Sequence, residues 1–178
     1  MTETTEKIVE SYVRYVKGWA TISNIKCPDQ HEIDLLAINP KDMERYHIES
    51  SVSVPGSGFS KLTNGTFDRE QMRVPGKAPS QQRTIGFFIE RKFGADGIVN
   101  TLAAYGFIPG NYHKVIVTWD YEPEAKETAK KNGIEVWEFP ELLDEIVDMA
   151  GKRKQYIMDD TVRTLQLIAC TQRRKGKI

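Results

Sequence analysis

Hydrophobic positions near the start of the chain recur at the three- and four-residue spacing of an α-helix. They are Ile8, Val9, Tyr12, Val13 and Val16. Gly18 follows as a typical helix stop, so the pattern predicts a helix over residues 5–18. The next run, WATISNI at 19–25, has the composition of a β-strand.

Two further runs with strand character lie close together in the sequence. They are EIDLLAI at 32–38 and RYHIESSVSV at 45–54, and the connection between them contains the turn residues Asn-Pro-Lys-Asp. So short a connection predicts an antiparallel hairpin. Because side chains alternate between the two faces of a strand, Asp34 shares a face with Leu36, and Glu49 shares one with His47.

The second half of the chain alternates between helical and strand-like patterns. A regular segment is expected at 84–93, helices at 95–106, 122–133, 140–150 and 155–170, and strands at 113–119 and 134–139. The strand–helix–strand unit requires a right-handed crossover between parallel strands. The order of elements therefore predicts an α/β fold with a mixed sheet.

One long segment interrupts this order. Residues 55–84 are rich in glycine, proline, serine and glutamine, and only a short strand is expected there, near LTNGTF at 62–67. Irregular segments of this length inside a domain are usually functional or mobile loops. We therefore expect one domain over residues 1–150 with a mobile basic loop inserted at 55–84. A C-terminal helix and basic tail follow at 151–178.

The formal net charge of zero conceals an uneven distribution of charge. Residues 55–84 carry a net charge of +3 and residues 151–178 carry +6, so the rest of the chain carries −9. Basic segments around an acidic body can hold a phosphate backbone while carboxylates hold cations. The simpler interpretation is a solvated surface with a fraying tail.

Composition narrows the classes of protein further. The 178 residues are 39% apolar and 28% charged, which is ordinary for a globular domain. We expect no membrane span, since no apolar run approaches about 18 residues, and no signal peptide, since the N-terminus is acidic and polar. Cys27 and Cys170 match no metal-binding or redox spacing, so we expect reduced thiols and a cytoplasmic protein.

The two strand acids suggest a cation site. Opposite residues of such a hairpin have Cβ atoms about 5 Å apart, so Asp34 and Glu49 would repel each other unless a cation lay between them. Mg²⁺ prefers such oxygen ligands, and in such a site it activates water and stabilises charge on a phosphate. The alternative is that both acids simply face solvent.

The hairpin resembles the PD-(D/E)xK nuclease superfamily, which has the restriction-endonuclease-like fold. Asp34 and Glu49 match the two acids of the family's motif. The resemblance implies that both hold Mg²⁺ or Mn²⁺, with the backbone carbonyl of Ser50 as a further ligand. It also implies a glutamate from the first helix, for which Glu6 and Glu10 both remain candidates, with Glu6 preferred.

The resemblance covers residues 5–54 and 113–147 and concerns the order of elements more than the motif itself. It implies an α/β, three-layer domain with a central mixed sheet flanked by helices. The implied function is a metal-dependent DNA endonuclease that hydrolyses phosphodiesters through a Mg²⁺-activated water. DNA is the expected partner, and many members of the fold work as homodimers.

The chain departs from the motif at Ser51, where the family carries a lysine. A lysine there lowers the pKa of the attacking water and stabilises developing charge, whereas a serine brings no charge. The superfamily lets this lysine move to another element, and Lys92 in IERKF is a candidate. Alternatively, Glu90 and Lys92 are themselves the catalytic strand, with Asp68 as the upstream acid.

Three functions therefore remain open. The chain is an active nuclease, a catalytically inactive module that binds nucleic acid or a protein on the same fold, or an unrelated α/β protein with solvated acids. Zinc is not expected, because His31, His47 and His113 have no paired spacing. His47 could line the acid site, since it shares a face with Glu49.

Overall fold

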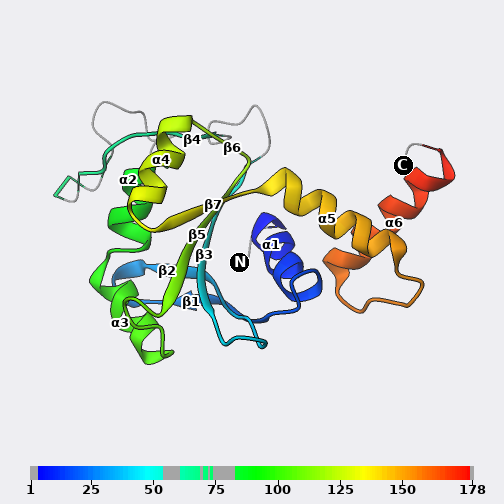
Figure 1. The fold of residues 1–178 in the computed structure, drawn as a ribbon, viewed down its shortest axis with the longest axis horizontal. Coiled ribbons are helices and arrows are strands. Elements are labelled where there is room, and N and C mark those ends of the chain that lie inside the picture. Colours follow the sequence, from blue (N-terminus) through cyan, green and yellow to red (C-terminus); the bar gives the residue numbers. More distant parts are fainter. Residues whose placement is uncertain (1–3, 54–60, 69, 72, 74–82, 177–178) are drawn as a thin grey trace.

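The computed structural model describes residues 4–53, 61–68, 70–71, 73 and 83–176 (Figure 1). The protein is an α/β fold with a five-stranded mixed sheet flanked by helices, as predicted. The sheet strands, in spatial order, are β1 (Ala20–Lys26), β2 (Glu32–Ile38), β3 (Arg45–Ser51), β5 (Tyr112–Thr118) and β7 (Ile134–Glu138). Strand β2 runs antiparallel to its neighbours β1 and β3, and β5 and β7 continue the sheet parallel to β3.

The longer helices follow the predicted order with shifted ends. They are α1 (Thr4–Tyr15), α3 (Asp96–Ala104), α4 (Pro123–Lys131), α5 (Phe139–Lys152) and α6 (Asp160–Arg174). Short helical turns are η1 (Pro28–Gln30), α2 (Ile85–Phe87) and the π-helical turn η3 (Phe88–Lys92). In the part of the chain that the structure describes, no helix is long and apolar enough to cross a membrane.

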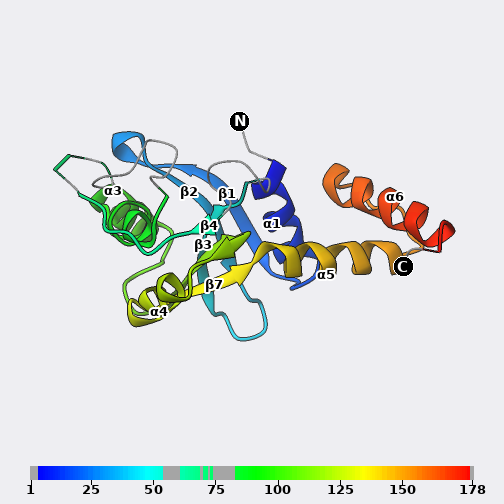
Figure 2. The ribbon, with the colours of Figure 1, turned by 90° about the horizontal axis from the view of Figure 1, so that it is seen from above.

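Helices cover both faces of the sheet (Figure 2). On one face α1 and α5 pack over Leu35 and Ala37 of β2, and on the other α3 packs over Leu36. The turn η3 and helix α4 cover the same second face at β5, where Ile116 is buried. Because both faces are buried, β2 and β5 contain short continuous apolar runs, at residues 35–37 and 115–117, rather than an alternating pattern.

The C-terminal helix joins the main core. Helix α6 packs against α5, and its Val162 is buried in the same cluster as Val13 of α1. It begins at Asp160 instead of the predicted 155, since the Asp159 side chain accepts a hydrogen bond from Val162 N at 3.0 Å and caps the helix there. Residues 160–174 are therefore integrated into the helical layer.

The described part of the predicted loop is anchored to the domain. Strand β4 (Lys61–Leu62) pairs with β6 (Asp120–Tyr121) in a small parallel sheet, and Leu62 is buried. The expected strand at 62–67 overlaps β4 only at Leu62. The remaining prediction of a mobile basic loop falls mostly on residues 54–60 and 74–82, which lie outside the described residues.

Candidate functional site

The hairpin register places the two acids opposite each other. Leu36 pairs with His47 and Leu35 with Ile48, so the next step along the strands sets Asp34 against Glu49. At that point side chains replace the ladder of backbone hydrogen bonds. Ser50 N donates to Asp34 Oδ2 at 2.8 Å, and Asp34 N donates to Glu49 Oε1 at 3.4 Å. Each carboxylate is thus held by the backbone of the neighbouring strand.

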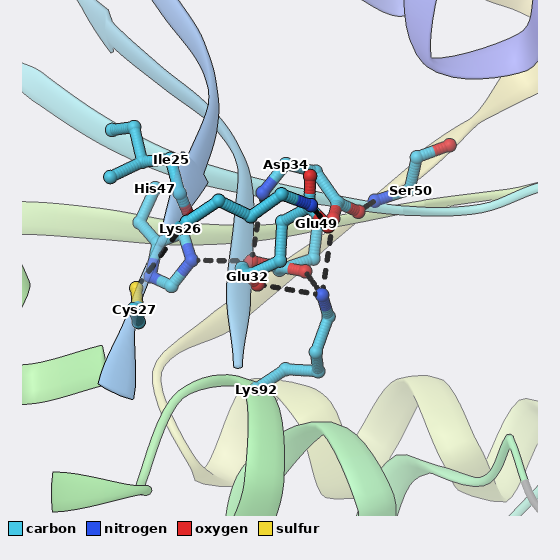
Figure 3. Close-up of polar contacts among 9 residues, drawn as sticks. All are labelled: Ile25, Lys26, Cys27, Glu32, Asp34, His47, Glu49, Ser50 and Lys92. Atoms are coloured by element: carbon cyan, nitrogen blue, oxygen red, sulfur yellow. Dashed lines mark hydrogen bonds and ion pairs between the residues drawn. The ribbon is translucent and has the colours of Figure 1, made fainter. Parts of the chain in front are cut away.

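Lys92 lies between the two acids (Figure 3). Its Nζ is 3.1 Å from Asp34 Oδ1 and 2.5 Å from Glu49 Oε2, and it also donates to the Glu32 carbonyl oxygen at 3.0 Å. Lys92 ends η3, which covers the sheet face that carries both acids. Lys92 therefore contacts both acids from another element, while Ser51 lies buried in β3.

The alternative catalytic strand is wrong. Glu90 and Lys92 belong to the helical turn η3, closed by the hydrogen bond from Phe93 N to Phe88 O, and not to a strand. Asp68 forms an isolated bridge with Arg73, and its Oδ1 accepts a hydrogen bond from Glu70 N at 2.9 Å. Aromatic packing of Phe88 in the core favours the helical turn over an extended edge.

Burial changes the protonation of the acids. The Glu49 side chain is fully buried and that of Asp34 is 12% exposed, so the interpretation of solvent-facing acids is wrong. Burial, with the neighbouring Glu49 charge, raises the pKa of Asp34 to about 7, and burial raises the pKa of Glu49 to about 6. Burial alone would lower the pKa of Lys92, but the Glu49 and Asp34 carboxylates outweigh it and raise that pKa.

The buried ring of His47 contacts the Glu49 carboxylate. Its Nε2 lies 2.7 Å from Glu49 Oε1, and the ring packs edge-on against Phe93. Burial and the Lys92 charge lower the pKa of His47 to about 3, so the ring is neutral at physiological pH. A neutral imidazole with its proton on Nε2 donates to the carboxylate, which makes His47 a positioning residue for Glu49.

A pocket of about 180 Å³ opens beside Asp34. Its lining residues are Glu6, Gln30, His31, Glu32, Asp34, Ser50, Arg83, Phe87, Phe88, Arg91 and Lys92. The structure thereby separates the two helix α1 candidates. Glu6 lines the pocket, whereas Glu10 forms an ion pair with Lys7 at 2.9 Å and accepts a hydrogen bond from Thr21 at 3.4 Å.

The donor set suits a hydrated hard cation better than zinc. Among the described residues no three His, Cys, Asp or Glu side chains gather as a ready-made metal site. Mg²⁺ commonly uses only one or two protein carboxylates and keeps several waters. Asp34 and Glu49 supply two carboxylates, and a cation would offset the burial and mutual repulsion that together raise the pKa of Asp34.

In protein free of divalent metal, we expect the unfolding free energy to fall as pH rises from about 4 to about 7. Folding raises the pKa of Asp34 from 3.8 to about 7. Between these values the folded state keeps a proton that the unfolded chain has lost, so rising pH favours unfolding by at most about 1.4 kcal/mol per pH unit through Asp34. The raised pKa of Glu49 adds to this slope. Urea unfolding of the wild type and Asp34→Asn at several pH values measures this difference. A pH-independent difference between them would contradict the raised pKa.

Comparison with known proteins defines neither a family nor a function. No family model matches the chain, and no curated protein matches it. A solved structure described as "Protein of Unknown Function AF1548" is similar over 97% of this chain and 98% of that chain. Its sequence identity is 16% and its TM-score is 0.47. Such a distant likeness leaves the functional question to the geometry of the site.

Proposed function

We propose that this chain is a restriction-endonuclease-like, metal-dependent DNA endonuclease of the PD-(D/E)xK type, with its lysine supplied by η3. The observation that carries this proposal is the contact of Lys92 Nζ with both Asp34 and Glu49. The sheet order, with an antiparallel hairpin followed by a parallel crossover and preceded by α1, agrees with the implied fold. The missing lysine at position 51 is then compensated by one from another element.

In this proposal the two acids are the ligands of a divalent cation. Asp34 and Glu49 would hold Mg²⁺ or Mn²⁺ with the backbone carbonyl of Ser50, and Glu6 would assist from the pocket wall. When bound, the cation supplies activation of water and stabilisation of charge on the phosphate. The hydrogen bonds from Ser50 N and His47 keep the two carboxylates in one orientation, which preorganises the site.

The cationic residues act on the substrate. Lys92, charged at neutral pH, orients the attacking water by a hydrogen bond and stabilises the negative charge that develops on the phosphate. Arg83 and Arg91 line the same pocket and attract the flanking phosphates of the DNA backbone. A purely structural ion pair would also place an ammonium about 3 Å from both acids. A cleavage assay therefore distinguishes a nuclease site from a structural ion pair.

A second candidate is a catalytically inactive module on the same fold. Its supporting observation is Ser51, an uncharged and buried residue at the motif's lysine position. Such a module would bind DNA through its arginines and leave the phosphodiester intact. Its Lys92 would serve only to neutralise the two buried carboxylates.

Incubation of the purified protein with supercoiled plasmid and Mg²⁺ or Mn²⁺ tests the proposal. We expect nicking or linearisation that is lost on addition of EDTA and in Glu49→Gln. Glu127→Gln, on the exposed face of α4, is the matched control and should cut as the wild type does. Cleavage that persists in Glu49→Gln would contradict this site. A salt-dependent gel shift without cleavage would favour the inactive module.

A further inference from the structure

A second recess of about 210 Å³ adjoins the pocket beside Asp34 and Lys92. The two share His31 and Arg91 as lining residues, so they are neighbours on one surface. Planar groups of Phe67, His31 and Arg91 line it. Gly94 and Ala95 leave room between these groups, because they carry little or no side chain.

Phe67 is held at this recess by close backbone packing. Ile85 N donates to Thr63 O at 3.0 Å, and Gly86 N donates to Gly65 O at 3.0 Å. A Cβ on Gly86 would lie 2.5 Å from Gly65 O and 2.7 Å from Phe67 N, so only glycine allows this approach. The Phe67 ring then packs edge-on against Phe87, with the centroids 5.5 Å apart. Phe67 is therefore held against α2, which contains Phe87.

His31, which lines the recess, follows a strained turn. Asp29 and Gln30 both have left-handed backbone conformations with φ of 58°, which non-glycine residues rarely adopt. The turn is packed against α3, where a Cβ on Gly97 would lie 3.1 Å from Pro28 O. Strain of this kind persists where the surrounding structure maintains it, commonly at binding and catalytic sites. Here it sets His31 between the two pockets.

Two carboxylates give the recess a preference among bases. Glu90 and Asp96 line it, and carboxylates are hydrogen-bond acceptors only. On an unpaired base, a carboxylate accepts from the N4 amino group of cytosine. The only ring donor of thymine, N3–H, lies between the O2 and O4 carbonyls, which repel the carboxylate. Planar side chains stack on the faces of unpaired bases, whereas a base inside a duplex is already stacked on both faces.

We infer that this recess binds one unpaired DNA base that carries an amino group, with cytosine favoured over thymine. The inference rests on the proposed function, because it places the scissile phosphate at Asp34, Glu49 and Lys92. The substrate is then single-stranded DNA, or a duplex that is unpaired beside the cut, as negative supercoiling favours in the plasmid of the cleavage assay. Continuous duplex offers the recess no exposed base.

Fluorescence anisotropy without Mg²⁺ or Mn²⁺ tests this inference independently of cleavage. We expect labelled oligo(dC) to bind roughly tenfold more tightly than oligo(dT), and more tightly than a continuous duplex. Phe67→Leu retains an apolar contact with Phe87 but removes the stacking face, so it should lose about tenfold in oligo(dC) affinity. Asp96→Asn should reduce the preference for cytosine, because an amide can also donate to thymine. Tyr105→Ala, an exposed aromatic after α3, is the control and should bind as the wild type does.

The outcomes separate the two ideas. A cytosine preference in a protein that cuts no DNA would overturn the nuclease and support the recess. Metal-dependent cleavage of plasmid, with equal binding of oligo(dC), oligo(dT) and duplex, would overturn the recess and retain the nuclease. Unchanged oligo(dC) affinity in folded Phe67→Leu, verified by its thermal melt, would also overturn the recess.

Discussion

Replacement of Lys92 by methionine should lower the rate of DNA cleavage by about 10²- to 10⁴-fold, the range for loss of a positioned proton-transfer or charge-stabilising group. The methylene chain is largely kept, but the charge beside the attacking water and the phosphate is lost. Initial rates of plasmid nicking at saturating Mg²⁺ measure the effect. Lys130→Met, on the exposed end of α4, should leave the rate unchanged.

The same substitution should also affect stability, so the two effects must be separated. Without the Lys92 ammonium, Asp34 and Glu49 are buried with no cation, and breaking such a pair destabilises by about 3 to 5 kcal/mol. Rates are therefore compared at a temperature where the thermal melt shows the variant folded. Adding Asp34→Asn to Lys92→Met should restore part of the stability and none of the activity. A folded Lys92→Met that cuts at the wild-type rate would reduce Lys92 to a structural role.

Asp34→Asn should abolish both metal binding and cleavage, with a loss of rate of about 10³-fold or more. An amide brings no negative charge to a divalent cation, and several kcal/mol of transition-state stabilisation correspond to this factor. Because a ligand that binds only the folded state raises its stability, Mn²⁺ should raise the melting temperature of the wild type. The variant should show no such increase, in either thermal melts or plasmid assays.

The control for Asp34→Asn is Asp144→Asn, a change of the same charge on the exposed face of α5. It should retain both the Mn²⁺-dependent increase in melting temperature and the cleavage rate. Equal stabilisation of Asp34→Asn and the wild type by Mn²⁺ would show that the cation binds elsewhere. Loss of stabilisation with retained cleavage would contradict the assignment of Asp34 to the reaction.

The acid pair was predictable because it depends on local rules. Strand alternation and a short hairpin connection are properties of neighbouring residues, and together they set Asp34 opposite Glu49. The same rules predicted the parallel crossover through β5, α4 and β7. They could not predict that both faces of the sheet are covered. The alternative that Glu49 faces solvent therefore remained open. The structure excluded it, because η3 packs over Glu49 and buries it.

Residues distant along the chain needed the tertiary structure. Lys92 is separated from Asp34 by 58 positions, and its local sequence also suited an exposed lysine or part of a strand. Glu6 and Glu10 lie one helical turn apart, so only the seating of α1 against the sheet decides which one faces the pocket. Phe67 gave no signal, because its position depends on the approach of Gly65 to Gly86.

The sequence by itself determined an α/β fold and a hairpin with two facing acids. Only the tertiary structure decided that Lys92, from another element, contacts both acids, and that the acids are buried with raised pKa values. The reason is physical. Periodicity reports which face of an element is apolar, whereas burial and charge pairing depend on which distant element packs over that face.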